Sequence, residues 1–397
     1  MTTTAETIII GGGVMGCSIA YNLAAKGMTG ILLLERDVLG SGSTGRSTAL
    51  VHTHYSTAVL ARMAWHSLHV FRNFHEVVGG RCGFTETGHL VFAGIADHGH
   101  TRARVALQQE AGIETSIINQ RDAAEIAPGF QLDDCAAIVY EPLSGYADAS
   151  GTALAYASRA RQLGVSIELR SPAEGLEITG GKISAVLTHN GRVSTQRVIV
   201  AAGAWTKSFL ARDGINLPLE VTRHEVAAFK RPSAGSDNLP GVSDMINQIY
   251  FRPEAGGLLL VGGGGLGETR ETVEDPAIYS HRPTQRSIES VWTRLAKRIP
   301  IMEKAEYTTG FAGLYTSTPD RHPIMDGVAG IEGLFLCAGF SGHGFKLAPA
   351  VGVTMAELVI DGRSSSIDIS PLRLARFDSG PKQEEDITLG QEGDVVI

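Results

Sequence analysis

The chain has 397 residues, of which 43% are hydrophobic and 19% are charged, a composition typical of a globular protein and not of a disordered one. Its length favours one large domain or two intergrown domains. The formal net charge is −8 and no basic stripe is visible, which argues against nucleic acid as a partner.

Other classes of protein are excluded by patterns that the sequence lacks. No apolar run approaches the roughly 18 residues of a membrane span, and the N-terminus lacks the basic region of a signal peptide. The thirteen histidines show no metal-ligand spacing, so we predict no metal site. The four cysteines form no CxxC pair and predict neither zinc binding nor disulfides, which makes a reducing cytoplasm the expected location.

The first 34 residues predict a βαβ unit. Residues 7–10 form a short β-branched run that suits a buried parallel strand, and glycines follow it. Residues 14–26 have helical periodicity, Gly27 ends the helix, and residues 31–34 form a second buried strand.

Strand–helix units at both ends of the chain bracket a β-rich middle. Helical periodicity recurs over residues 60–71, 151–163 and 346–360, and strands are predicted over 84–93, 136–140, 165–169, 198–201, 217–229, 248–252, 258–262 and 334–338. We therefore expect an α/β fold, with a Rossmann-type nucleotide-binding domain built from discontinuous segments and an inserted antiparallel-sheet substrate domain.

The expected domain boundaries follow from this alternation. The nucleotide-binding domain would comprise residues 1–80, 147–215 and 305–377, and the substrate domain residues 81–146 and 216–304. Residues 378–397 contain six acidic residues and one lysine, which predicts a solvated acidic tail in preference to a partner-binding arm.

Gly11, Gly13 and Gly16 have the spacing GxGxxG between the first strand and helix, and Glu35 ends the next strand. The first glycine permits a tight turn, the second lets the backbone approach a pyrophosphate, and the third allows close helix–strand packing. The helix N-terminus favours phosphate, and Glu35 can accept both hydroxyls of an adenosine ribose. The pattern predicts a dinucleotide site.

A second loop rich in glycine and hydroxyl groups, residues 42–49, follows the strand that ends in Glu35. A loop at this place suggests a cofactor longer than one nucleotide, because a flavin needs such a segment beside its ring. On this argument alone, FAD is mildly favoured over NAD.

At this point the sequence resembles the FAD-dependent amine and amino-acid oxidoreductases, which include sarcosine oxidase, dimethylglycine oxidase, glycine oxidase and D-amino-acid dehydrogenases. The resemblance extends over about 358 residues, from about residue 5 to about residue 362. It is carried by the segments IIIGGGVMGCSIAYNLAAKG, LLLERD, GSGSTGRSTAL, VIVAAGAW, GLYTSTPDRHPIMD and CAGFSGHGFKLAPAVG. It implies that the Rossmann-type domain binds FAD.

The resemblance implies that residues 339–346 form a loop against the flavin pyrimidine, with the dipole of the following helix stabilising negative charge there. It also implies flavin contacts from the second loop and adenine contacts near residue 173. The expected FAD contacts are Gly11, Gly13, Val14, Met15, Gly16, Glu35, Arg36, Ser43, Thr44, Arg46, Ser47, Thr48, Ala49, Leu50, Ala173, Gly203, Trp205, Gly313, Gly339, Gly342, His343, Gly344, Phe345 and Lys346.

The sequence departs from its relatives at three positions. Members similar to dimethylglycine oxidase attach flavin through a histidine at the position of Arg46, and sarcosine-oxidase-like monomers through a cysteine at the position of Gly313. Neither nucleophile is present, so we expect non-covalent FAD. Sarcosine oxidase also activates oxygen with a lysine that falls within residues 258–261, here LLLV, so either oxygen or another carrier is expected as electron acceptor. The run Gly262–Gly265 follows and is expected to form a loop close to the substrate.

His224 and Tyr250 are candidate catalytic residues, because dimethylglycine-oxidase-like enzymes carry an active-site histidine and tyrosine in similar segments. The reaction needs a neutral amine before hydride leaves the adjacent carbon, and such a pair could hold the amine or take its proton. The alternative is an ordinary histidine and tyrosine of the sheet and its core.

Lys346 and His52 complete the candidate substrate site. The resemblance gives Lys346 the role of holding the substrate carboxylate, against the alternative of a surface lysine. The partner arginine of sarcosine oxidase falls at His52, which is a weaker clamp and either contacts the substrate or packs near the loop. For His343, the backbone is expected to matter more than the imidazole.

The function expected from these features is FAD-dependent oxidation of the C–N bond of a secondary or N-methylated amino acid. Hydride would pass to flavin N5, and the imine would then be hydrolysed. The alternatives are a D-amino-acid dehydrogenase acting on a primary amine and a flavin-binding subunit without amine chemistry of its own. A homo- or hetero-oligomer is compatible with all three functions.

Overall fold

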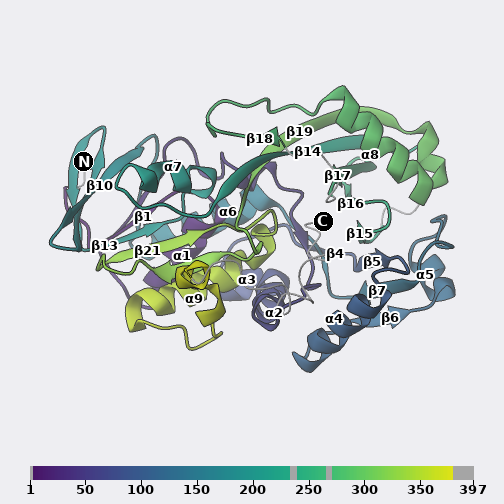
Figure 1. Ribbon diagram of the computed structural model, residues 1–397, viewed down its shortest axis with the longest axis horizontal. Helices are drawn as coiled ribbons and strands as arrows, with labels where there is room; N and C mark the ends of the chain where they lie inside the picture. The colour runs from purple at the N-terminus through teal and green to yellow at the C-terminus, as the bar shows by residue number, and fades with distance from the viewer. Residues whose placement is uncertain (1–2, 233–238, 265–270, 379–397) are drawn as a thin grey trace.

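The computed structural model describes residues 3–232, 239–264 and 271–378. Two large β-sheets organise this part of the chain: a six-stranded sheet with its helices at the left of Figure 1, and a nine-stranded sheet at the right. No helix among these residues is long and apolar enough to cross a membrane.

The six-stranded sheet is parallel except at one edge. The central strand β1 pairs in parallel with β2 and β13, so that Ile9 lies opposite Leu33 on one side and Ile199 on the other. The strands therefore come from three distant parts of the chain, as a discontinuous Rossmann-type fold requires. Their order is β20 (Ile324–Gly327), β21 (Leu334–Ala338), β13 (Arg197–Val200), β1 (Thr7–Ile10), β2 (Ile31–Leu34) and β9 (Ser166–Glu168), with β20 antiparallel to β21.

Side-chain alternation along the buried strands gives this sheet two apolar faces. Ile9, Leu33 and Ile199 pack on one face against helices, whereas Ile8 and Ile10 point to the opposite face. The helical face is covered by α1 (Val14–Ala25), α2 (Ala58–Arg72), α6 (Ala149–Gln162) and α9 (Ala348–Asp361), and the opposite face by the antiparallel sheet of β10 (Ala173–Thr179), β11 (Lys182–Thr188) and β12 (Gly191–Ser194).

The nine-stranded sheet is mainly antiparallel, with one parallel pair between β15 and β5. One face packs on helices α8 (Gln285–Arg298) and α5 (Gln120–Ile126) through Phe92, Phe251 and Leu259, which leaves the other face to turn towards the parallel sheet. The strand order is β18 (Glu271–Thr272), β14 (Glu220–Lys230), β17 (Leu258–Gly263), β16 (Ile249–Glu254), β15 (Gly241–Asp244), β5 (His89–Ala93), β7 (Ala137–Glu141) and β6 (Ser116–Ile118), and β19 (Glu306–Ser317) also pairs with β14.

Shorter elements connect these layers. The helices are α3 (Phe74–Val77), α4 (His98–Glu110), α5 (Gln120–Ile126), α7 (Thr206–Ala211) and α8 (Gln285–Arg298); the 3-10 turns are η1 (Thr44–Arg46), η2 (Gly203–Trp205), η3 (Pro300–Lys304), η4 (Phe345–Leu347), η5 (Ser370–Leu372) and η6 (Leu374–Phe377); β3 (Leu50–Val51), β8 (Gly145–Tyr146) and β4 (Thr85–Glu86) form a small sheet.

The expected α/β fold and its main strands are confirmed, with ends that differ by a few residues. The expected strand over residues 84–93 is interrupted and forms β4 and β5. The β10–β12 sheet and helices α4, α5 and α8 had no counterpart among the elements expected from the sequence. The proposed domain boundaries stay a prediction, and the acidic tail beyond residue 378 lies outside the described residues.

Arg298 at the end of α8 ties that helix to the nine-stranded sheet. Its side chain is fully buried, and Nε donates to Asp244 Oδ2 over 2.7 Å. Asp244 is itself fully buried, while Asp134 supplies a second, half-exposed carboxylate. A guanidinium is well suited to such buried bidentate pairing because its donors form a rigid fork.

Replacing Arg298 with leucine should therefore destabilise the fold. The change leaves the Asp244 carboxylate buried without its cation, and breaking one side of a buried pair costs about 3–5 kcal/mol. Chemical denaturation would measure this loss. Arg121→Ala, which removes an exposed pair with Glu125, should cost less than about 1 kcal/mol; equal effects of the two substitutions would contradict the assignment.

Candidate functional site

A cavity of about 740 Å³ runs from the carboxyl ends of the parallel strands to the inner face of the nine-stranded sheet. Glu35 and Arg36 line one end, and His224 and Tyr250 line the other. Ligands of open α/β sheets bind at the carboxyl ends of the strands, where the chain turns into helices. The position and elongated lining suit one extended ligand that reaches the second sheet.

The glycine turn between β1 and α1 is defined by backbone contacts. Gly11 has φ +113°, and a Cβ there would lie 2.4 Å from the carbonyl oxygen of Ala201. A Cβ on Gly16 would lie 1.9 Å from the carbonyl oxygen of Gly11. Both positions therefore exclude any side chain, and they bring the N-terminus of α1 against the cavity, as the sequence predicts.

The Glu35 carboxylate is held in place at the end of β2. Its Oε2 accepts the Gly12 N–H over 2.6 Å, and its Oε1 accepts the Asp37 N–H over 2.8 Å. Each oxygen keeps a second lone pair, and the residue lines the cavity. The side chain is thus preorganised to accept further hydrogen bonds from a diol.

Trp205 and Arg36 form the wall of the same end of the cavity. The Arg36 guanidinium lies 4.4 Å from the centre of the indole ring, a cation–π contact. Trp205 Nε1 is buried without a hydrogen-bond acceptor among the residues that the structure describes. A buried donor of this kind on a cavity wall fits a ligand that supplies an acceptor.

The second glycine-rich loop lies over the start of α1. Thr44 Oγ1 accepts the Val14 N–H over 3.0 Å, and Ser43 Oγ donates to the carbonyl of Leu314 over 2.7 Å. Arg46 donates to the carbonyls of Ser41 and Gly42, so its guanidinium folds back on its own loop. The loop thereby contacts both the start of α1 and β19.

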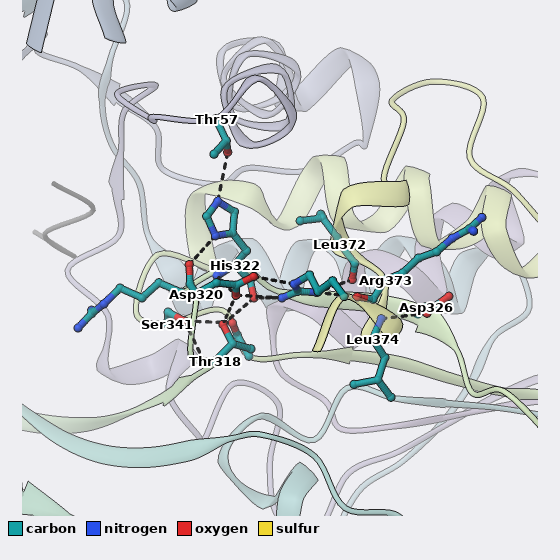
Figure 2. A network of polar contacts seen from close by, with 12 residues as sticks. Thr57, Thr318, Asp320, His322, Asp326, Ser341, Leu372, Arg373 and Leu374 are labelled. Atoms are coloured by element: carbon teal, nitrogen blue, oxygen red, sulfur yellow. Dashed lines mark hydrogen bonds and ion pairs between the residues drawn. The ribbon is translucent and has the colours of Figure 1, made fainter. Parts of the chain in front are cut away.

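Residues 339–344 form the third loop at the cavity, and a polar network braces it (Figure 2). Ser341 Oγ lies 3.4 Å from the Thr318 N–H, and Thr318 Oγ1 donates to the carbonyl of His322 over 2.7 Å. Asp320 pairs with Arg376 over 2.7 Å, which links the loop to the turn η6. His322 Nε2 lies 3.3 Å from Thr57 Oγ1.

Cross-strand register places His224 and Tyr250 on one face of the nine-stranded sheet. Val226 on β14 lies opposite Gly262 on β17, which in turn lies opposite Tyr250 on β16. His224 is two residues from Val226 and so shares its face. On the other side of β14, Tyr315 lies opposite Thr222 and shares this face too. The sheet therefore gathers three polar aromatic side chains at the cavity.

Tyr315 joins the two candidate residues. Its ring stacks on the His224 imidazole with centroids 3.7 Å apart and an interplanar angle of 17°. Its hydroxyl lies 3.3 Å from that of Tyr250. His224 Nε2 lies 3.0 Å from Thr222 Oγ1, which orients the imidazole. Burial raises the pKa of Tyr315, so its phenol stays protonated at neutral pH.

Gly262 makes room for the Tyr250 ring. A Cβ at this position would lie 2.1 Å from Tyr250 Cζ. Gly262 and Gly263 belong to β17, so the expected loop begins later than the sequence suggests. Gly264 follows the strand, and Gly265 lies outside the described residues.

Lys346 lines a smaller cavity of about 30 Å³ that shares Tyr250 and Tyr315 with the large one. The residue is 7% exposed, and its Nζ lies 5.7 Å from the centre of the Tyr55 ring. Burial lowers the pKa of Lys346 to about 7, against the opposing attraction of Glu141. Lys346 is therefore no surface lysine, and near neutral pH it exists in both protonation states.

His52 lies behind Lys346. Its ring is buried against that of His89, with centroids 4.6 Å apart, and neither ring nitrogen has a hydrogen-bond partner in the described part of the chain. Burial and the nearby Lys346 lower the pKa of His52 well below its ordinary value. A neutral imidazole at this place cannot act as a charged clamp, and His52 lines neither described cavity.

Most of the expected cofactor contacts line the large cavity. Leu50, His343 and Lys346 line the smaller one, and Gly16 and Ala49 line neither. His343 is fixed through Nε2 at 2.9 Å from the carbonyl of Arg321. The sequence analysis did not identify Tyr315 as a site residue, because only its pairing with β14 reveals the face on which it lies. The signal available in the sequence was its place in the segment GLYTSTPD, one of the segments that carry the family resemblance.

The glycine cradle, the anchored Glu35 and the unpaired indole N–H of Trp205 fit an FAD whose adenosine end lies at β2. The loops of residues 42–49 and 339–344 leave space in the cavity for the flavin ring of the same cofactor, beside His224 and Tyr250. The residues present therefore fit this cofactor.

Comparison with known proteins agrees with this fit. L-proline dehydrogenase from P. horikoshii superposes with a TM-score of 0.88 and 27% identity, covering 96% of this chain and 99% of that one. In sequence, 4-methylaminobutanoate oxidase (formaldehyde-forming) of Paenarthrobacter nicotinovorans is 28% identical over 95% of this chain and 46% of its own length. Human mitochondrial sarcosine dehydrogenase is 27% identical over 95% of this chain and 42% of its own.

A relative named for a regulatory role is about as similar. The mitochondrial pyruvate dehydrogenase phosphatase regulatory subunit of Mus musculus is 28% identical over 94% of this chain and 43% of its own length. The chain thus spans less than half the length of these three curated relatives. Residues 6–358 match the family described as FAD dependent oxidoreductase, and the chain belongs to that family.

Proposed function

We propose that this chain binds FAD non-covalently and oxidises the C–N bond of a secondary or N-methylated amino acid. One observation carries the proposal: His224, Tyr315 and Tyr250 lie on one face of the sheet, and Lys346 lies at the adjoining small cavity. This arrangement offers groups for an amine and a cation for a carboxylate within one space. Relatives named for 4-methylaminobutanoate, sarcosine and L-proline, which all carry a secondary amine, support the substrate class.

In this proposal the domain formed by residues 1–80, 147–215 and 305–377 holds FAD, and residues 81–146 and 216–304 supply the substrate side. Glu35 would accept the ribose hydroxyls, and the N-terminus of α1 would hold the pyrophosphate. The loop of residues 339–344 would lie against the flavin pyrimidine. When bound, FAD supplies the acceptor for the hydride that leaves the carbon next to nitrogen.

His224 and the two tyrosines position the amine and its proton. A substrate amine must be neutral before the adjacent carbon gives up hydride, and His224 can take that proton. Tyr315 stays protonated because burial raises its pKa, and the hydroxyls of Tyr315 and Tyr250 can donate or accept hydrogen bonds at the nitrogen. Water then hydrolyses the imine product to an amine and an aldehyde or keto acid.

Non-covalent attachment of the flavin is supported by the two positions at which relatives carry a flavin-attaching residue, Gly313 and Arg46, which lie next to each other. A Cβ on Gly313 would lie 3.0 Å from the Cβ of Arg46, and neither residue carries a nucleophile. Acid precipitation of the purified protein should therefore leave the flavin in the supernatant. Flavin that stays with the precipitate would contradict this part of the proposal.

Two other functions stay open as rivals. A D-amino-acid dehydrogenase would act on a primary amine at the same site, and a flavin-binding subunit would carry no amine chemistry. The regulatory-subunit relative favours the second rival. The segment 258–261, within which the oxygen-activating lysine of sarcosine oxidase falls, contains no lysine in this chain, and its Leu260 packs with Val226 and Ala228. A carrier other than oxygen is therefore favoured as acceptor.

Anaerobic addition of amino acids to the FAD-loaded protein tests the proposal. N-methylated or cyclic secondary amino acids should bleach the visible flavin absorption, and the matched primary L- and D-amino acids should not. Bleaching by D-amino acids alone would favour the first rival. If no amine bleaches the flavin, the catalytic proposal fails.

Gly262→Ala should impair catalysis without loss of FAD. The new methyl group displaces the Tyr250 ring, and a displacement of about 1 Å at a reacting group can cost on the order of 100-fold in rate. We expect kcat/KM to fall at least about tenfold, measured with flavin content unchanged. Gly175→Ala is the matched control, since its Cβ would only touch Leu187 at 4.0 Å. Unaltered turnover in Gly262→Ala would count against a role for Tyr250.

The affinity for a carboxylate should depend on the protonation of Lys346. Because the pKa of Lys346 is lowered to about 7, its cation is present below pH 7 and lost above it. The Kd of (methylthio)acetate, which lacks an amine, should rise about tenfold per pH unit above about pH 7. Flavin absorption changes would report binding. A Kd that is independent of pH, or unaltered by Lys346→Met, would contradict this role.

A further inference from the structure

The segment that connects β18 to α8 forms part of the wall of the large cavity. We call its residues 273–284 the strap; they form neither a helix nor a strand. Four of them line the cavity: Pro276, Ala277, Tyr279 and His281. None of these four residues was expected among the cofactor contacts, and the proposed reaction gives the strap no role.

The strap bridges the two large sheets. Val273 packs in a buried apolar cluster with Val221 of β14 and Leu314 of β19. The cluster also contains Ala204 of η2, which follows the parallel strand β13, and Tyr279 packs against it. Figure 1 shows the loop beside β18 reaching from the nine-stranded sheet towards the parallel sheet. The strap is thus a part of the cavity wall that rests on both sheets.

Arg223 on β14 fixes the strap from the face of the sheet opposite to the cavity. Its side chain alternates with that of His224, which lines the cavity, and it is 4% exposed. Its Nε donates to the carbonyl of Ser280 over 2.8 Å, and a terminal nitrogen donates to the carbonyl of Arg282. One rigid guanidinium therefore holds the two backbone carbonyls that flank His281.

Glu225 lies on the same face of β14 and holds the end of the strap. Its Oε1 lies 2.6 Å from a terminal nitrogen of Arg223 and accepts the Thr284 N–H over 2.9 Å. Its Oε2 accepts the Thr284 hydroxyl over 3.1 Å. Because Thr284 caps the N-terminus of α8, the carboxylate also lies where the helix dipole favours a negative charge.

A third anchor comes from β19, where the Ala312 N–H donates to the carbonyl of His281 over 2.8 Å. The contacts of Asp275 are local by comparison. Its Oδ1 accepts the Ala277 N–H and its carbonyl accepts the Ile278 N–H, each over 2.9 Å. The part of the strap that lines the cavity is therefore held in place mainly from its carboxyl end.

Arg223 and Glu225 line neither described cavity, so they act through the strap and not on a bound ligand. A ligand that is held without a covalent bond dissociates at a rate that depends on how firmly the walls of its site are fixed. The anchors of the strap therefore bear on how long a cofactor stays in the large cavity.

We propose that the strap retains FAD in the large cavity and that Arg223 and Glu225 are the positioning residues that keep it in place. The inference rests on the proposed non-covalent binding of FAD. It assigns a function to a buried ion pair that lies outside the catalytic groups, on the opposite face of the strand that carries His224.

The test measures how fast FAD leaves the loaded protein after dilution, as flavin that passes an ultrafiltration membrane over time. Arg223→Leu removes the donors to Ser280 and Arg282 and leaves Glu225 without its cation. It should raise the release rate at least about tenfold, because hydrogen bonds from a charged donor are strong enough to account for such a factor.

Arg298→Leu is the matched control, since it also removes a buried, ion-paired arginine but lines neither cavity. It should lower stability and leave the release rate within about twofold, because Arg298 shares no partner with the strap. The rates are compared at a temperature at which circular dichroism shows every variant to be folded. An equal rise in both arginine variants would overturn the inference.

A double variant separates action through the strap from a general loss of stability. Tyr279→Ala removes the side chain that packs against the apolar cluster and should raise the release rate above that of Tyr307→Ala, which removes an exposed tyrosine of β19. Two changes that loosen the same segment should not be additive, so Arg223→Leu with Tyr279→Ala should release FAD about as fast as Arg223→Leu alone. Multiplication of the two single effects would contradict a role of Arg223 in the strap.

Glu225→Gln provides a further variant in case Arg223→Leu does not fold. Glutamine keeps an acceptor for Thr284 but removes the charge that pairs with Arg223, so it should raise the release rate by a smaller factor. If the strap variants release FAD no faster than the controls, the inference alone is overturned. If the unaltered protein keeps its flavin in an acid precipitate, non-covalent binding fails and the inference with it.

Discussion

The site depends on the cross-strand register of β14, β17 and β16, because that register decides which side chains reach the cavity. Val226, Gly262 and Tyr250 lie in one row across the three strands. Gly262 leaves the space that the Tyr250 ring fills. A slip of one residue would turn His224 and Tyr250 to the opposite face, against α8 and α5. The chemistry of the sheet is thus a consequence of its hydrogen-bonded pairing.

Burial then determines which titratable side chains of the site carry a charge. Imidazoles removed from water lose their proton readily, so His52, His89 and His343 are neutral. Burial lowers the pKa of Lys346 to about 7, against the opposing attraction of Glu141. The same low dielectric that penalises these charges makes their interaction effective over distance. Recognition of an anionic group would therefore depend on one cation and not on an arginine–lysine pair.

Local patterns made the cofactor half of the molecule predictable from the sequence. Gly11, Gly13 and Gly16 define a turn, and Glu35 ends the next strand. All four residues lie in one short continuous segment, so the sequence pattern alone predicts this part of the site. The position of Tyr315 and the role of Gly262 arise instead from pairing between distant strands. The burial of Lys346 arises from the packing of η4 against α2 and β3. Periodicity reveals neither. The sequence placed His52 near the loop but could not show that His89 would stack on it.

The most direct test of this account is a crystal structure of the FAD-loaded protein with (methylthio)acetate below pH 7. The account predicts the carboxylate within hydrogen-bond distance of Lys346 Nζ, in the small cavity lined by Tyr250 and Tyr315. The thioether, which replaces the amine of the corresponding N-methyl amino acid, should then lie towards His224. A ligand bound elsewhere, with Lys346 out of contact, would contradict the assignment of the substrate site.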